Sequence, residues 1–209
     1  MLEVKNLSFA YLGCEPLFKN LMFHVKHSER LAIQAPSGYG KSTLCRLLAA
    51  YEQADSGSIL VNGQLLARRG ACPVQLIGQH PELFLNPYMR MGKSLAEAGS
   101  ISWDILNTLG IKQEWFDRFP HELSGGELQR FCIARAFAAH PKFLIADEIS
   151  TMLDALTQSQ IWHFILNECK YREIGLVFVS HSPALTARLA SRVLDLTEVC
   201  SEQTERPLA

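Results

Sequence analysis

A glycine-rich segment between an apolar run and a helical stretch is the feature that most constrains the fold of this chain. The segment, APSGYGKST, covers residues 35–43; the apolar residues 31–34 precede it, and residues 41–50 have helical spacing. Gly38 and Gly40 allow the backbone to curl so that successive N–H groups converge on an anion, and the following helix presents its positive end there. A strand before and a helix after this segment together predict a phosphate-binding loop.

This loop has the side chains needed to bind a nucleoside triphosphate. Lys41 is expected to bridge the β and γ phosphates of a bound nucleotide, and the Ser42 hydroxyl to bind Mg²⁺. The pattern GxxxxGK[ST] has glycine where this chain has Ala35, and alanine would cost on the order of 1 kcal/mol if that position required a positive φ. The alternative is a chance Gly-Lys-Ser in a turn. The residues expected to contact the nucleotide here are Ala35, Pro36, Ser37, Gly38, Tyr39, Gly40, Lys41, Ser42 and Thr43.

Strands and helices alternate along most of the chain. Short apolar runs at residues 21–25, 31–34, 74–77, 143–146, 176–179 and 193–196 predict strands, and residues 127–139, 155–170 and 183–190 predict helices. Asn62-Gly63 favours a hairpin with a type I′ turn within residues 59–66. This alternation predicts an α/β fold with a mainly parallel sheet and helices on its faces. Together with the phosphate-binding loop, the chain resembles a P-loop NTPase (RecA-like) core, which implies an N-terminal antiparallel β subdomain as well.

Residues 81–123 interrupt the alternation. They are irregular and mostly helical in pattern, with breakers such as Pro87, Gly92, Gly110 and Pro120, and they predict an inserted helical subdomain. The 209 residues then form a single domain, with a nucleotide-binding core at residues 1–80 and 124–200 and a loose polar tail at residues 201–209.

Composition narrows the functional classes. Twenty basic and twenty-one acidic residues give a formal charge of −1, so the chain lacks the overall basic character that is typical of nucleic-acid binding. The six cysteines form no CxxC pair, which favours reduced packing cysteines over disulfides or zinc. No run of about 18 apolar residues and no secretory signal is found, so we expect a cytosolic protein.

An acidic pair ends one of the predicted strands. In KFLIADE, residues 142–148, an apolar run leads to Asp147 and Glu148, and parallel sheets bind ligands at such strand ends. Asp147 is expected to hold Mg²⁺ through water, and Glu148 to orient the attacking water. Without a phosphate-binding loop, a solvated acidic pair would be the better interpretation.

The segment LSGGELQR, residues 123–130, resembles the signature of the ATP-binding cassette (ABC) family when it is taken together with the two preceding motifs. Ser124, Gly125 and Gly126 open a predicted helix and offer a hydroxyl and backbone N–H groups to an anion. The resemblance implies that this anion is the γ-phosphate of ATP held by a second subunit, so that two chains enclose two ATP molecules. The resemblance to the family covers residues 2 to about 196.

Four further positions fit the same family pattern. The resemblance implies that Tyr11 stacks on adenine, that Gln79 reaches Mg²⁺ and leads to a membrane partner, that Asp154 lies in a loop crossing to the other subunit, and that His181 contacts the γ-phosphate. The alternative interpretations are that Tyr11 is a packed tyrosine, Gln79 a surface glutamine and His181 a structural histidine.

Within the family, the absence of a long heptad insert and the single cassette favour a transporter subunit. Residues 79–87 and 120–130 resemble the peptide and nickel importer ATPases, which implies permease subunits, an extracytoplasmic binding protein and a position on the inner face of the membrane. The alternative is a regulatory ATPase that acts by ATP-dependent dimerisation. Residues 80–95 are expected to dock the permease through apolar side chains, with core packing as the alternative interpretation; these are Phe84, Leu85, Tyr88 and Met89.

Overall fold

The computed structural model describes residues 1–66, 70–151 and 153–198. The predicted polar tail at residues 201–209 lies outside the described residues, as does Cys200. Among the described residues, no helix has both the length and the apolar character needed to cross a bilayer. The five described cysteines are free thiols, and burial raises the pKa of both Cys132 and Cys169 to about 12. These thiols therefore remain protonated and pack as small apolar groups, as expected.

One of the two sheets is antiparallel and has the order β2-β1-β4-β5. Its strands are β1 (Leu2–Phe9), β2 (Phe18–Val25), β4 (Ser56–Val61) and β5 (Gln64–Leu65). The hairpin between β4 and β5 turns at Asn62 and Gly63, which have φ values of 53° and 79°. Positive φ at both central residues is the type I′ geometry that the Asn-Gly pair predicted.

The second sheet is parallel and has the order β6-β7-β8-β3-β9. Its strands are β3 (Arg30–Gln34), β6 (Val74–Ile77), β7 (Phe143–Asp147), β8 (Gly175–Val179) and β9 (Arg192–Asp195). The chain leaves β3, β7 and β8 at the same edge, which is where open parallel sheets bind their ligands. The glycine-rich loop, Glu148 and His181 follow these three strands directly.

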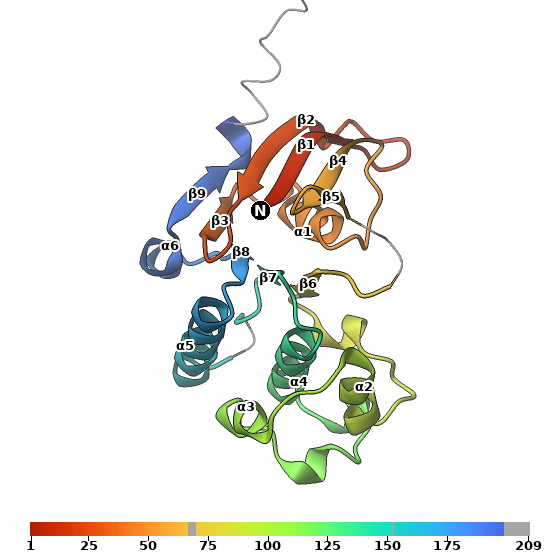
Figure 1. Ribbon diagram of the computed structural model, residues 1–209, viewed down its shortest axis with the longest axis vertical. Coiled ribbons are helices and arrows are strands. Elements are labelled where there is room, and N and C mark those ends of the chain that lie inside the picture. The colour runs from red at the N-terminus through yellow and green to blue at the C-terminus, as the bar shows by residue number, and fades with distance from the viewer. Residues whose placement is uncertain (67–69, 152, 199–209) are drawn as a thin grey trace, which may run out of the picture.

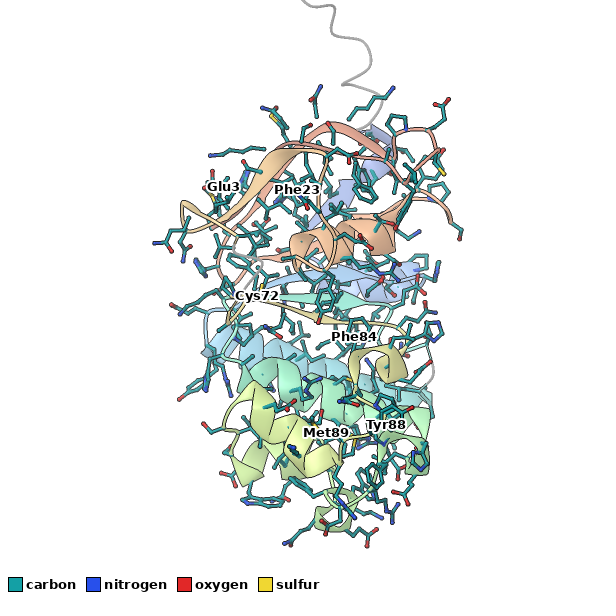
Figure 2. All side chains as sticks on the ribbon, turned by 90° about the vertical axis from the view of Figure 1, so that its right-hand side faces the viewer. Glu3, Phe23, Cys72, Phe84, Tyr88 and Met89 are labelled. Carbon is teal, nitrogen blue, oxygen red and sulfur yellow. The ribbon has the colours of Figure 1, made fainter. Side chains whose placement is uncertain are left out.

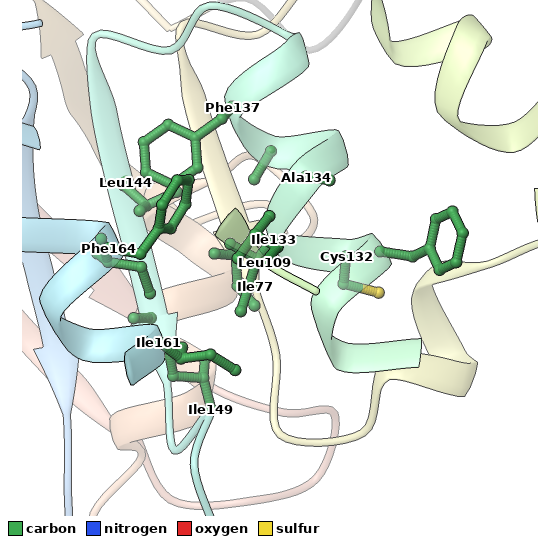
Figure 3. Close-up of a cluster of buried hydrophobic side chains, with 14 of the residues drawn as sticks. Ile77, Leu109, Cys132, Ile133, Ala134, Phe137, Leu144, Ile149, Ile161 and Phe164 are labelled. Atoms are coloured by element: carbon green, nitrogen blue, oxygen red, sulfur yellow. The ribbon is translucent and has the colours of Figure 1, made fainter. Parts of the chain in front are cut away.

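Helices cover both faces of the parallel sheet (Figure 1). Helix α1 (Lys41–Leu48) lies between the two sheets, where it shares one hydrophobic cluster with strands of both. On the other face lie α4 (Gly125–Ala138) and α5 (Ala155–Tyr171), while α6 (Pro183–Leu189) precedes β9. Figure 3 shows Ile133 and Phe137 of α4 together with Ile161 and Phe164 of α5 in this second cluster. The P-loop type of α/β fold is therefore confirmed.

Residues 81–123 form the lower part of the molecule in Figure 1. Their elements are η1 (Pro81–Phe84), α2 (Met91–Ala98), α3 (Trp103–Thr108), η2 (Gln113–Trp115) and η3 (Pro120–Glu122). Leu95, Leu106 and Trp115 are buried in the same cluster as Phe131 of α4. The segment thus packs on the helix that begins with Gly125, and its division from the core as a subdomain stays a prediction.

Candidate functional site

The glycine-rich loop joins β3 to α1 and turns at two glycines. Gly38 and Gly40 have φ values of 88° and 83°, a region that residues with a Cβ rarely adopt. At Gly40 a Cβ would also lie 2.4 Å from Cδ2 of Leu17. Ala35 does not have a positive φ, and its side chain packs against the cluster between the two sheets. Alanine at the first position of the loop is therefore free of the strain that a positive φ would have caused.

Lys41 is buried, and its ammonium group lies inside the loop. Its Nζ donates to the carbonyl oxygens of Ala35 and Pro36, at 2.9 and 3.0 Å. Both bonds are to neutral acceptors. A phosphate oxygen offers a charged acceptor and makes a stronger hydrogen bond, so an anion in the loop would compete effectively for this ammonium.

Asp147 ends β7, and its carboxylate is buried beside α1. Burial raises the pKa of Asp147, and a hydrogen bond from Ser42 acts in the opposite direction. Its Oδ1 has no hydrogen-bond partner within the part of the chain that the structure describes. Ser42, Gln79 and Asp147 line one cavity of ≈ 310 Å³. A buried carboxylate oxygen without a partner, next to a hydroxyl and an amide, fits the oxygen ligands of Mg²⁺.

Glu148 follows Asp147 in an unusual backbone conformation. Its φ is 51°, which is uncommon for a residue with a long side chain and costs on the order of 1–3 kcal/mol. Its backbone N–H donates to Val179 of the adjacent strand, and its Oε1 lies 2.7 Å from Nε2 of His181. The Glu148 side chain is 10% exposed and that of His181 59%. The strained residue thus directs its carboxylate to the edge where the loop lies.

A second cavity, of ≈ 480 Å³, joins these groups to the loop. Its lining includes Lys41, Ser42, Glu148 and His181 together with Tyr11. Because Ser42 lines both cavities, the two adjoin at the start of α1. The structure therefore brings together the loop, the acidic pair and the histidine that the sequence predicted.

Tyr11 forms one wall of the second cavity. Its hydroxyl lies 3.0 Å from Oγ1 of Thr43, and its ring and that of Phe9 meet edge to face with centroids 4.9 Å apart. The side chain remains 41% exposed. Tyr11 is thus packed on one side and exposed on the other, and its stacking on adenine stays a prediction.

Residues 124–126 lie outside the linings of both cavities. Ser124 caps α4: its Oγ accepts from the backbone N–H of Glu127, whose carboxylate in turn accepts from the Ser124 backbone at 2.7 Å. Asp154 caps α5 in the same manner, accepting from the N–H groups of Leu156 and Thr157. The predicted site residues therefore form two groups, one around Lys41 and one at the beginnings of α4 and α5.

Sequence reasoning missed Arg46 and Leu83, which line the first cavity together with Gln79. Arg46 lies four residues after Ser42, and residues at this spacing share one face of a helix. The helical pattern of residues 41–50 therefore held the signal for Arg46. Leu83 is 72% exposed and lies in η1, an irregular segment that offered no such periodicity.

Comparison with known proteins agrees with this geometry. The ABC transporter family model matches residues 18–151. The glutathione import ATP-binding protein of Salmonella typhimurium is 34% identical over 84% of this chain and 31% of the relative. The di/tripeptide transport ATP-binding protein of Pseudomonas aeruginosa is 32% identical over 93% of this chain and 69% of the relative. The chain thus spans about a third of the length of the first of these two proteins.

Solved structures share the fold. A dimeric ATP-binding cassette bound to ADP and phosphate aligns with a TM-score of 0.78 at 23% identity, covering 93% of this chain and 94% of the other. At this identity the likeness concerns the arrangement of strands and helices.

Proposed function

Because this chain belongs to the ABC transporter family of ATPases, we propose that it binds and hydrolyses ATP to power a membrane importer of peptides or similar small solutes. The observation that supports this most is the arrangement of Lys41, Asp147, Glu148 and His181 around two adjoining cavities. Lys41 follows β3, the consecutive Asp147 and Glu148 end and follow β7, and His181 follows β8. The parallel sheet brings these three strand ends to one edge.

Binding begins at the loop. The N–H groups between Gly38 and Lys41 and the N-terminus of α1 attract the phosphates. Lys41 exchanges its bonds with the Ala35 and Pro36 carbonyls for phosphate oxygens, a change from neutral to charged acceptors. Tyr11, which also lines the second cavity, offers the exposed part of its ring to the base.

Hydrolysis depends on Glu148. Its carboxylate is nearly buried and lies at the cavity that holds the phosphates, so it can orient a water and accept its proton. His181, 2.7 Å away, holds this carboxylate in place and reaches toward the γ-phosphate. Mg²⁺, held by Ser42 and Asp147 with Gln79 nearby, would neutralise charge on the phosphates.

A second copy or a related cassette completes the site. Ser124, Gly125 and Gly126 line neither cavity of their own chain, and the helix N-terminus they form is suited to an anion from elsewhere. A Cβ at Gly126 would lie 3.2 Å from Cδ2 of Leu153, so this segment adjoins the residue that precedes Asp154. We infer that this segment meets the γ-phosphate bound by the partner chain.

The permease is proposed to dock at residues 80–95. Tyr88 is 90% exposed, and Figure 2 shows it on the same face as Phe84 and Met89. Leu85 is buried in the hydrophobic core, so the expectation that it belongs to the docking surface is wrong. Phe84 is half-buried, with its ring centroid 5.7 Å from that of Tyr51. We include Leu83 in this surface instead of Leu85, because Leu83 is exposed and lines the first cavity together with Gln79.

The class of substrate rests on the names of relatives, which are a glutathione import protein, a di/tripeptide transport protein and an oligopeptide transport protein. Nickel chelates, expected from the sequence, remain within the proposal. An extracytoplasmic binding protein would deliver the solute, and this chain would lie on the inner face of the membrane. A regulatory ATPase outside transport is not favoured, because these relatives are named as import or transport proteins.

The test is to co-express the chain with its neighbouring permease and binding protein and to reconstitute the complex in vesicles. We expect ATP hydrolysis to rise when a di- or tripeptide, glutathione or a nickel chelate is added with the binding protein. The same complex carrying Lys41→Ala is the control and should show no rise. Stimulation only by an unrelated solute would refute the substrate class, and failure of the chain to copurify with the permease would refute the transport role.

A further inference from the structure

A cavity of ≈ 260 Å³ lies between α5 and α6, and the ATP site uses none of its lining residues. Both helices lie at the same side of the molecule in Figure 1. The floor is apolar and belongs to the hydrophobic core: Trp162 and Leu189 are buried, while Leu166 and Leu185 are half-buried and pack on the same cluster. This floor can cover the apolar body of a small molecule.

The polar groups of this cavity are neutral or basic. Arg188 of α6 and His163 of α5 line it and are exposed, and its lining contains no aspartate or glutamate. Among the ion pairs of the described residues, none involves Arg188. The guanidinium thus has its donors free for a planar anion, which a carboxylate matches in geometry.

Gln158 connects the cavity to the segment that follows Glu148. Its Nε2 donates to Oγ of Ser150 at 2.7 Å, and the indole N–H of Trp162 donates to the same oxygen at 3.3 Å. Gln158 also lines the cavity. Ser150 is buried and lies two residues after Glu148. Because two lining residues bond to Ser150, the cavity lies next to the segment that begins with Glu148.

We propose that the cavity between α5 and α6 binds a small amphipathic monocarboxylate, with its carboxylate on Arg188 and its apolar body on Trp162, Leu185 and Leu189. The absence of an acidic lining residue disfavours zwitterions such as free amino acids, because their ammonium group would lose water without gaining a carboxylate partner. The cavity shares no lining residue with the two cavities of the proposed ATP site, so binding there is tested separately from the proposed transport function.

The probe is 4-phenylbutyrate, titrated into the full ¹⁵N-labelled chain while the three tryptophan indole signals are followed. A ligand of this size is expected to bind with a dissociation constant of roughly 1 mM. The Trp162 signal should shift and saturate. Trp103 and Trp115 lie outside the lining and act as internal controls.

Matched ligands and variants test the contacts separately. The neutral amide 4-phenylbutyramide and the variant Arg188→Gln should each weaken binding about tenfold, because each removes the charged hydrogen bond. Lys170→Gln removes the same charge from the last turn of α5, outside the lining, and should leave the dissociation constant unchanged within about twofold. Thermal unfolding of both variants verifies that they fold.

Three results would overturn the proposal. They are shifts of all three indoles without saturation, unchanged binding to Arg188→Gln, and binding of phenylalanine as tight as that of 4-phenylbutyrate.

Discussion

Replacing each glycine of the phosphate-binding loop by alanine tests how this loop is held. Gly38 and Gly40 have nearly the same φ, so alanine meets a similar backbone cost of about 1–2 kcal/mol at each. Their surroundings differ. A Cβ at Gly38 meets nothing within 4 Å, whereas at Gly40 it would lie 2.4 Å from Cδ2 of Leu17 and 2.9 Å from Cζ of Phe18.

The additional cost at Gly40 follows from these contacts. Phe18 is 1% exposed and packs between the sheets, so it cannot move away without disturbing the core. Forcing a carbon into a packed region costs about 1–3 kcal/mol. We therefore expect Gly40→Ala to lower the free energy of unfolding by about 2–5 kcal/mol, and Gly38→Ala by about 1–2 kcal/mol.

Urea unfolding of the nucleotide-free variants measures both losses. Leu17→Ala, alone and combined with Gly40→Ala, isolates the overlap, because shortening Leu17 removes the nearest atoms. The free energy of unfolding of the double variant should fall by about 1 kcal/mol less than the sum of the losses in the two single variants. Equal losses for the two glycine variants, or strict additivity with Leu17→Ala, would refute the reasoning.

Three further predictions concern single residues. Ala50 closes the C-terminus of α1 with a φ of 60°, while Tyr51 N–H donates to the Arg46 carbonyl; Ala50→Gly should raise the free energy of unfolding by about 1 kcal/mol and the Tm by about 2–4 °C. Burial raises the pKa of Asp147, so the free energy of unfolding falls as pH rises through this pKa. Asp147→Asn should therefore be more stable than the parent chain at neutral pH. Chemical denaturation should show this difference shrinking as pH falls toward the ordinary pKa range of an aspartate. Ala35 has an ordinary φ, so Ala35→Gly should change steady-state ATPase activity by less than about tenfold, and activity found only in the glycine variant would contradict this.

The fold could be predicted from the sequence largely because its patterns are local. The apolar runs at residues 31–34, 74–77 and 143–146 appear as β3, β6 and β7, and the Asn62-Gly63 pair forms the turn that its residue types require. The predicted order of loop, acidic pair and histidine placed these groups at one edge, because parallel strands have their carboxyl ends together.

Long-range packing explains what the sequence could not show. Phe84, Leu85 and Tyr88 look alike as apolar residues in an irregular segment. In the fold, Leu85 is buried in a cluster with α4, Phe84 is half-buried against Tyr51, and Tyr88 is exposed. Both α4 and Tyr51 are distant from this segment in sequence. The residue type of Glu148 likewise does not indicate its positive φ, which occurs together with its backbone bond to Val179 and its contact with His181.

Hydrolysis of ATP by two variants tests the central proposal most directly. Glu148→Gln keeps the phosphate contacts but removes the group that accepts the proton from water, so we predict ATP binding near that of the parent chain and turnover lowered by about 100-fold or more. Lys41→Ala is the matched comparison and should weaken ATP binding itself. Undiminished hydrolysis by Glu148→Gln would contradict the assignment of this residue, and unchanged ATP affinity in Lys41→Ala would contradict the phosphate-binding loop.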